Sequence, residues 1–355
     1  MELSESEVKN KELSLKSGLV LWLFAGCFLI FGMVIVGGIT RLTGSGLSIT
    51  EWKVVTGTIP PLNEKEWNDA FDKYKLIPQY QVVNLHFTLQ DFKYIFFWEY
   101  IHRLFGRLIG FVFLGGFIYF LKKKAISKSL MPKLLLMFVL GGVQGFLGWY
   151  MVSSGLSENI RVSHLRLAIH LTFAFITFGY IFYIALTQLY PEKINNQSVV
   201  KSLSKQGNIL LVLIIAQIIY GAFVAGTKAG WTYNTWPKMA DEWIPSSIPY
   251  AWVEDGISSL WNNLATVQFI HRMLAYVVAG FITYIFLKAK KSTLLNSAQQ
   301  KATTILFALV VFQIILGIGT LVMNVPIWMG VMHQATAFFL FASCIYYLQS
   351  LKLKV

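Results

Sequence analysis

The chain has 355 residues, of which 55% are hydrophobic and only 13% are charged. Soluble domains carry about 25% charged residues, so this composition excludes an ordinary soluble enzyme and indicates a membrane protein. The formal net charge is +13, and both cysteines lie within apolar stretches, which argues against a disulfide-stabilised secreted domain.

Apolar stretches long enough to cross a bilayer core of ~30 Å, about 20 residues each, occur eight times along the chain. They cover residues 18–39, 100–121, 134–152, 165–189, 208–226, 267–287, 302–322 and 327–348. The predicted fold class is therefore an all-α polytopic membrane protein with eight transmembrane helices.

The distribution of basic residues predicts the orientation of these helices. With the N-terminus inside, the internal segments hold 17 lysines and the external loops hold nine basic residues, six of them in the long first loop. Short loops rich in Lys and Arg stay in the cytoplasm, so we expect both termini to be cytoplasmic. The N-terminus lacks the features of a cleaved signal or transit peptide, which favours a bacterial inner membrane. The basic charge is explained by this orientation and requires no nucleic acid.

The sequence repeats itself. His102 and His271 are 169 positions apart within similar segments, and Gln144 and Gln313 are also 169 apart, whereas His170 and His333 are 163 apart. Internal duplication of this kind determines the architecture, and we predict two tandem, pseudo-symmetric four-helix bundles. The predicted domains are a cytoplasmic N-terminus (1–17), an N-terminal bundle (18–190), a cytoplasmic linker (191–207), a C-terminal bundle (208–351) and a cytoplasmic tail (352–355). Spans one and five are aligned by their glycines, Gly32 with Gly221 and Gly37 with Gly226.

Four of the six histidines lie near the outer ends of spans two, four, six and eight, namely His102, His170, His271 and His333. A single intramembrane histidine is often a hydrogen-bonded core residue, but four in repeat-related pairs indicate a site. Two imidazoles from two helices of one bundle suit the axial ligation of haem iron, whereas zinc prefers three or four ligands, often including sulfur. The sequence therefore favours one haem in each bundle.

Arginine follows two of these histidines directly, as Arg103 and Arg272. Guanidinium groups bind carboxylates in a bidentate manner, which makes both arginines candidate anchors for haem propionates. The alternative is that each arginine extends toward the lipid headgroups.

One position breaks the repeat next to a histidine. Three residues before His102 the chain has Glu99, whereas three residues before His271 it has the neutral Gln268. Residues at this spacing share a helix face, so the N-terminal bundle carries an ionisable group beside its predicted haem. Glu99 is the candidate catalytic acid, base or electrostatic stabiliser; the alternative is a structural partner for Arg103 or a backbone cap.

The first external loop contains a predicted helix, in which Asn63 and Glu66 fit a capping box and Trp67, Ala70, Phe71 and Tyr74 form an apolar stripe. Such a helix lies at the membrane interface or acts as a lid over a site. Two further histidines have no repeat partner: we expect His86 to be a surface residue and His164 to lie beside a site at most.

The motifs "GGITRLTGSGLSITEWKVVTGTIPP", "EYIHRLFGR", "HLRLAIH", "FIHRM" and "MHQATA" resemble, in this order, the haem A synthase family in its mitochondrial and proteobacterial-like form. The resemblance covers essentially the whole chain. It implies that the chain oxidises the C8 methyl of haem O to a formyl group, by successive hydroxylations to a gem-diol, and so supplies haem A to terminal oxidases.

The resemblance also assigns roles to the candidate residues. His102, His170 and Arg103 would hold the substrate haem O, and His271, His333 and Arg272 would hold a haem B cofactor. Glu99 occupies the place of the family's essential glutamate. Implied partners are membrane lipid, the farnesyltransferase that makes haem O, an electron acceptor and a second copy of the chain. Some bacterial relatives carry a cysteine pair in the first external loop, which this chain lacks.

Two other functions remain open from the residues alone. A dihaem b-type cytochrome that only transfers electrons would use the same four histidines. A transporter is compatible with parallel repeats, although the spans show no interruption at the midplane. Identification of the haems extracted from the purified protein distinguishes all three functions.

Overall fold

The structure is a computed structural model that describes residues 5–52, 56–156, 159–190 and 198–352. Within these residues it contains no β-strand and has eight helices that are long and apolar enough to cross a membrane. They are α1 (Glu5–Leu42), α4 (Leu89–Lys122), α5 (Met131–Leu156), α6 (His164–Leu189), α7 (Ser198–Thr227), α10 (Leu264–Lys290), α11 (Ser297–Val322) and α12 (Ile327–Ser350). The predicted fold class and the number of spans are confirmed.

The helices extend beyond the predicted spans because polar caps, and not the apolar stretch, determine where they begin. Thr88 and Asp91 form a reciprocal capping box at the start of α4, and Asn296 and Gln299 form one at the start of α11. Such boxes satisfy the free N–H groups of a first helical turn. Helix α7 already begins at Ser198, within the predicted linker, and residues 191–197 of that linker lie outside the described residues.

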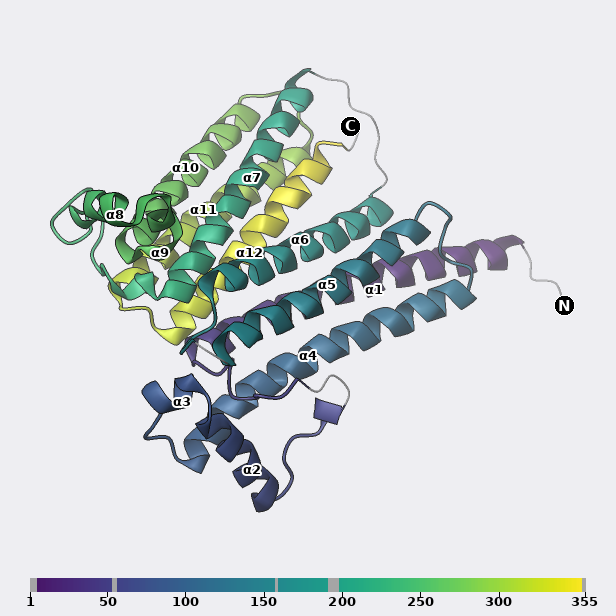
Figure 1. Cartoon of the computed structure of the whole chain (residues 1–355). Coiled ribbons are helices and arrows are strands. Elements are labelled where there is room, and N and C mark those ends of the chain that lie inside the picture. The colour runs from purple at the N-terminus through teal and green to yellow at the C-terminus, as the bar shows by residue number, and fades with distance from the viewer. Residues whose placement is uncertain (1–4, 53–55, 157–158, 191–197, 353–355) are drawn as a thin grey trace.

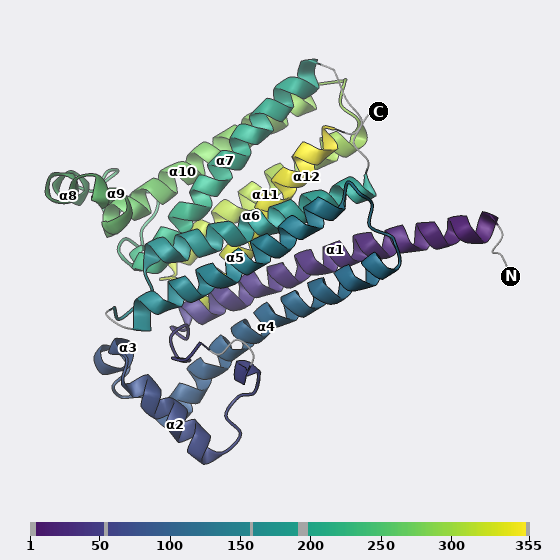
Figure 2. The same ribbon diagram turned by 45° about the vertical axis from the view of Figure 1, so that its right-hand side comes forward.

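The eight helices lie in two groups (Figures 1 and 2): α1, α4, α5 and α6 on one side, and α7, α10, α11 and α12 on the other. Within the groups, the closest neighbours are the antiparallel pairs α1–α4, α5–α6, α7–α10 and α11–α12. The groups meet through α6 with α7, α1 with α12, and α6 with α12. The pseudo-symmetric relation between the groups and the exact domain boundaries stay predictions.

The two groups of helices contact each other through aromatic side chains and through a hydrogen bond beside a glycine. Phe178 of α6 and Phe338 of α12 have ring centroids 4.1 Å apart in the main hydrophobic core. Gln334 of α12 donates a hydrogen bond to the Val34 carbonyl of α1 over 2.8 Å. Gly38 permits this contact, because a Cβ atom there would lie 2.9 Å from the Gln334 side chain. The two groups are therefore held in a fixed relation at the depth of the histidines.

Both long loops lie at the same end of the assembly, and the first turn of α1 and the last turn of α12 lie at the other end (Figure 1). The first loop contains η1 (Thr56–Thr58), α2 (Glu64–Lys75) and α3 (Pro78–Val82). The second loop contains η2 (Ala229–Trp231), α8 (Ser247–Asp255), η3 (Gly256–Ser258) and α9 (Ser259–Asn262). An even number of spans places both ends of the helical assembly on one side, as the sequence predicts.

Helix α2 occupies the predicted position, and its apolar stripe packs against protein. The side chain of Asn63 accepts a hydrogen bond from the Glu66 N–H, while Glu66 in turn accepts one from Leu62 N–H, so the cap is shifted by one residue from a standard box. Phe71 and Tyr74 are buried in a second hydrophobic cluster with Phe92 of α4. Helix α2 therefore covers the outer end of α4, and this stripe is not available to lipid.

Candidate functional site

Each of the four intramembrane histidines lies against a glycine of the preceding long helix in the chain. A Cβ atom on each of these glycines would lie close to the Cε1 atom of the histidine. The pairs are His102 with Gly37 (3.1 Å), His170 with Gly148 (3.2 Å), His271 with Gly221 (3.4 Å) and His333 with Gly317 (2.9 Å). The absence of a side chain at these glycines makes room for the imidazoles.

This contact corrects the sequence alignment of spans one and five. Gly221 packs against His271, and its structural counterpart in α1 is Gly37, not Gly32, which faces Phe105 instead. Both spans contain two glycines at the same spacing, so the sequence pattern fits either alignment. The structure distinguishes them because Gly37 faces His102 and Gly221 faces His271, whereas Gly32 faces Phe105 and Gly226 faces His164.

Three of the four glycines follow a glutamine by one helical turn, and each glutamine contacts the same histidine. Gln144 Nε2 donates to the His170 carbonyl over 3.2 Å, Gln217 Nε2 to that of His271 over 3.1 Å and Gln313 Nε2 to that of His333 over 3.1 Å. In all three pairs the same Nε2 lies 3.2 Å from the imidazole Nδ1. The sequence analysis aligned Gln144 with Gln313 but missed Gln217, because it used the wrong glycine alignment.

His102 lies on α4 and His170 on α6, whereas His271 lies on α10 and His333 on α12. Each half therefore carries two intramembrane histidines, and their pairing at one haem stays a prediction. Among the described residues there is no cluster of three or more His, Cys, Asp or Glu side chains that could hold a metal ion. Two imidazoles in one half suit haem iron, whereas zinc prefers three or four ligands; the assignment of these histidines as metal ligands stays a prediction.

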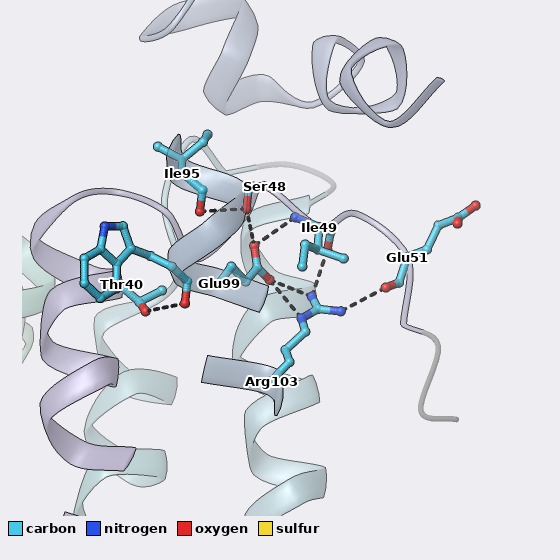
Figure 3. Close-up of polar contacts among 8 residues, drawn as sticks. Thr40, Ser48, Ile49, Glu51, Ile95, Glu99 and Arg103 are labelled. Carbon is cyan, nitrogen blue, oxygen red and sulfur yellow. Dashed lines mark hydrogen bonds and ion pairs between the residues drawn. The ribbon is translucent and has the colours of Figure 1, made fainter. Parts of the chain in front are cut away.

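Glu99 is buried, with 2% of its surface exposed, and both of its oxygens accept hydrogen bonds (Figure 3). Oε2 accepts from the Ser48 hydroxyl and from the Ile49 N–H, each over 2.8 Å. Oε1 accepts from Nη2 of Arg103 over 2.6 Å and from its Nε over 3.1 Å. Glu99 is therefore both the ion-pair partner of Arg103 and a cap for the loop that follows α1.

Arg103 holds the same loop. It donates to the Ile49 carbonyl over 2.8 Å and to the Glu51 carbonyl over 2.9 Å (Figure 3). Its guanidinium carbon also lies 4.9 Å from the centroid of the Trp52 ring. Four hydrogen bonds thus fix the guanidinium between α4 and the loop. Its assignment as a propionate anchor stays a prediction.

In the C-terminal half, an uncharged amide takes the place of the carboxylate in this arrangement. Gln268 donates to the carbonyls of Ala229 and Tyr233 over 2.9 and 3.1 Å, and its Oε1 accepts from Arg272 over 3.3 Å. Arg272 also donates to the carbonyls of the second external loop, at Tyr233, Thr235 and Lys238. Its Nε is buried and has no hydrogen-bond partner among the described residues; its assignment as a propionate anchor stays a prediction. In both halves, the residues at these two positions therefore connect the histidine-bearing helix to an external loop.

The remaining candidates lie apart from the paired histidines. His86 is exposed, as expected. His164 lies at the start of α6 and packs against Phe223 and Gly226 of α7, so it lies where the two halves meet. Arg41 likewise joins the halves, because its Nη1 donates to the Ala225 carbonyl of α7 over 2.7 Å.

Comparison with known proteins agrees with this arrangement. Residues 20–345 match the family described as cytochrome oxidase assembly protein. A haem A synthase from Flavobacterium psychrophilum is 49% identical over 92% of this chain and 96% of its own length. The chain belongs to the haem A synthase family.

Other members of the haem A synthase family are similar over their whole lengths. The haem A synthase of Flavobacterium johnsoniae is 47% identical over 94% of this chain and 97% of its own length. That of Nitrosospira multiformis is 42% identical, with 95% and 94% covered. Membership of this family confirms the resemblance given by the sequence motifs and does not favour the electron-transfer cytochrome.

Proposed function

We propose that this chain is a membrane-embedded oxidoreductase that converts haem O to haem A, by oxidising the C8 methyl group to a formyl group through successive hydroxylations. The observation that carries the proposal is the pair of imidazoles in each half, set against glycines at matched positions. Relatives named haem A synthase cover more than nine-tenths of the chain. Geometry and family thus indicate the same chemistry.

The two halves have different roles in this proposal. His102 and His170 hold haem O as the substrate, whereas His271 and His333 hold haem B as the resident cofactor, which supplies electron transfer when bound. The Glu99–Gln268 difference supports this division. Glu99 places a buried carboxylate three residues from His102, and the second half has an uncharged amide at the corresponding position.

Glu99 acts in this scheme as a fixed anion. Its four hydrogen-bond donors hold the carboxylate and leave it no freedom to move toward a substrate without breaking the Arg103 pair. A preorganised charge of this kind stabilises opposite charge that develops on a reacting group without reorganising in the transition state. We infer that it stabilises positive charge on the methyl group under oxidation.

The loops attached to these residues exclude water. Glu99 and Arg103 hold residues 48–51 over the outer end of α4, and Arg272 holds residues 233–238 over α10. Excluding water from a reaction site strengthens the electrostatic interactions inside it. The loops thus close the outer ends of the two haem sites.

The proposal also includes the membrane, the orientation and the partners of the protein. It resides in a bacterial inner membrane with both termini cytoplasmic, so the haem sites lie in the outer leaflet. It receives haem O from the farnesyltransferase that makes it and passes electrons to an acceptor. The placement of both long loops at one end supports this orientation.

The function is tested by extracting haems from cells that make haem O but no haem A. We expect haem A to appear when the chain is expressed and to be absent when His102→Ala replaces it. A matched control is His86→Ala, a surface variant that leaves the haem A yield unchanged. An electron-transfer cytochrome would leave haem O unconverted in every case.

A further inference from the structure

The sites of the four intramembrane histidines share one pattern, and His102 departs from it. In α5, α7 and α11 a glutamine precedes the histidine-facing glycine by four residues, as Gln144, Gln217 and Gln313. At the same place in α1, four residues before Gly37, the chain has Met33. A thioether is at best a weak acceptor, so His102 has no amide partner on this helix.

The hydrogen bonds around the four rings reflect this difference. The Nε2 atoms of Gln144, Gln217 and Gln313 each lie 3.2 Å from the Nδ1 of their histidine and 3.3–3.5 Å from its Nε2. His102 Nδ1, in contrast, is buried without a hydrogen-bond partner in the described structure. A buried donor or acceptor without a hydrogen-bond partner costs free energy. The missing partner of His102 Nδ1, at one of the four histidine sites, therefore requires a reason.

Ligation of iron explains what the glutamines can do. An imidazole that binds iron through Nε2 carries its proton on Nδ1 and needs an acceptor there. The Oε1 atoms of Gln144, Gln217 and Gln313 are all buried and without partners. The O and N ends of an amide are assigned from the hydrogen-bond network. Half a turn of the amide presents Oε1 to the Nδ1–H, in exchange for the Nε2 bond to the histidine carbonyl. Each glutamine can therefore fix its histidine as a ligand.

We propose that Met33 makes His102 the one weakly held ligand of the four, so that the substrate haem is firmly bound on the His170 side and exchangeable on the His102 side. This inference rests on the proposed function, since it concerns the haem of the N-terminal half. Hydrogen bonds from neighbouring side chains orient metal ligands, and their loss weakens metal binding 10–100-fold. A substrate haem must enter and leave, whereas a resident cofactor must stay, and the three glutamines and one methionine match these needs.

A second departure occurs at the same ring. Glu99, the other position at which the halves differ, lies three residues before His102 on α4. Met33 lies on α1 and faces α4, because its Cε would be 3.4 Å from a Cβ atom on Gly106. Two independent differences between the halves thus converge on one histidine. The geometry assigns the reactive, exchangeable face of the substrate haem to the His102 side.

Carbon monoxide tests this assignment, because it binds a reduced haem only after an axial ligand has left. The protein, purified with its haems from cells that supply haem O, is reduced and mixed with carbon monoxide, and binding is followed by absorbance. We expect rapid binding at one haem. Met33→Gln, which supplies the missing amide, slows that binding by about tenfold, whereas Met33→Leu keeps the unmodified rate. The low-spin spectrum of the second haem reports folding in each variant.

The reverse change provides a gain-of-function control. Gln217→Met removes the amide from His271, and the C-terminal haem then acquires carbon monoxide binding that the unmodified protein lacks there. Equal rates in the unmodified protein and Met33→Gln, or no carbon monoxide binding at all, overturn the inference. Haem A in the same cells is measured separately by chromatography. If the cells make haem A but Met33→Gln binds carbon monoxide at the unmodified rate, only this inference is contradicted. If the cells make no haem A, the proposed function is contradicted.

Discussion

His333 lies so close to Gly317 that a Cβ atom on the glycine would be 2.9 Å from its Cε1. Real Cβ contacts are almost never this short, so the ring and the helix cannot both stay in place if a methyl group is added. The corresponding distance from Gly221 to His271 is 3.4 Å, an ordinary van der Waals contact. The two ligands of one predicted haem therefore differ in how much space their glycines leave.

We predict that Gly317→Ala displaces His333 and lowers the haem B content of the purified protein severalfold, whereas Gly221→Ala has a smaller effect. The reason is steric: overpacking a close contact costs about 1–3 kcal/mol. The measurement is haem B per protein by extraction. Gly280→Ala is the matched control, since nothing lies within 4 Å of its Cβ position; an equal loss there would show that the effect is not specific to the histidine.

Arg272 connects α10 to the second external loop through three carbonyls and Gln268. Arg272→Lys keeps the charge but loses the planar fork that makes several of these bonds at once. We expect faster hydrogen exchange in residues 233–238 and lower haem B retention, with stability reduced by about 2 kcal/mol. Arg166→Lys, in the other half, should leave haem B unchanged. Intact retention in Arg272→Lys would show that the guanidinium contributes nothing to that site.

Lys228 lies at the outer end of α7 with a left-handed backbone, φ 63°. Burial, followed by the charges of Arg161 and Arg41, lowers the pKa of Lys228 below its ordinary value. Folding therefore disfavours the charged lysine, and this penalty disappears as the pH rises through the lowered pKa toward 10.5, the ordinary value. Asparagine tolerates the left-handed conformation and carries no charge.

We accordingly predict that Lys228→Asn raises the thermal unfolding temperature in detergent at pH 7 and that the gain shrinks as the pH approaches 10.5, the ordinary value. The measurement is the unfolding temperature at a series of pH values. Lys238→Asn is the control, because Lys238 is exposed and lies in the same external loop. A gain that is independent of pH would attribute the whole effect to the backbone.

The eight helices were predicted from apolar length and are confirmed. The pairing of His102 with His170 and of His271 with His333 rests on the duplication and stays a prediction. These features depend on spacing along one helix, which a sequence records directly. The position of α2 and its cap were also predicted, and its apolar stripe contacts α4; whether α2 lies at the membrane interface stays a prediction.

What the sequence did not reveal depends on contacts between helices. Gln217 and Met33 can be compared only when Gly221 and Gly37 are known to face histidines. Both helices have two glycines at the same spacing, so the sequence left the alignment of spans one and five ambiguous. The loop contacts of Glu99 with Ser48 and Ile49 join residues about 50 positions apart, and no periodicity encodes them. The ion pair with Arg103, by contrast, was one of the two sequence-based interpretations of Glu99.

The central claim is that oxidation occurs in the N-terminal half, beside the fixed anion of Glu99. Glu99→Gln removes the charge, keeps the shape and gives the first half the side chain of the second, while Gln268→Glu makes the reverse change at the cofactor site. Loss of a preorganised charge of this kind costs about 3 kcal/mol, or a hundredfold in rate.

The most direct test is chromatography of the haems from cells that supply haem O and express Glu99→Gln. The account predicts a folded protein that retains haem B and accumulates haem O or a hydroxylated intermediate, with little haem A. A normal yield of haem A from Glu99→Gln would contradict the account and leave Glu99 as a structural partner of Arg103.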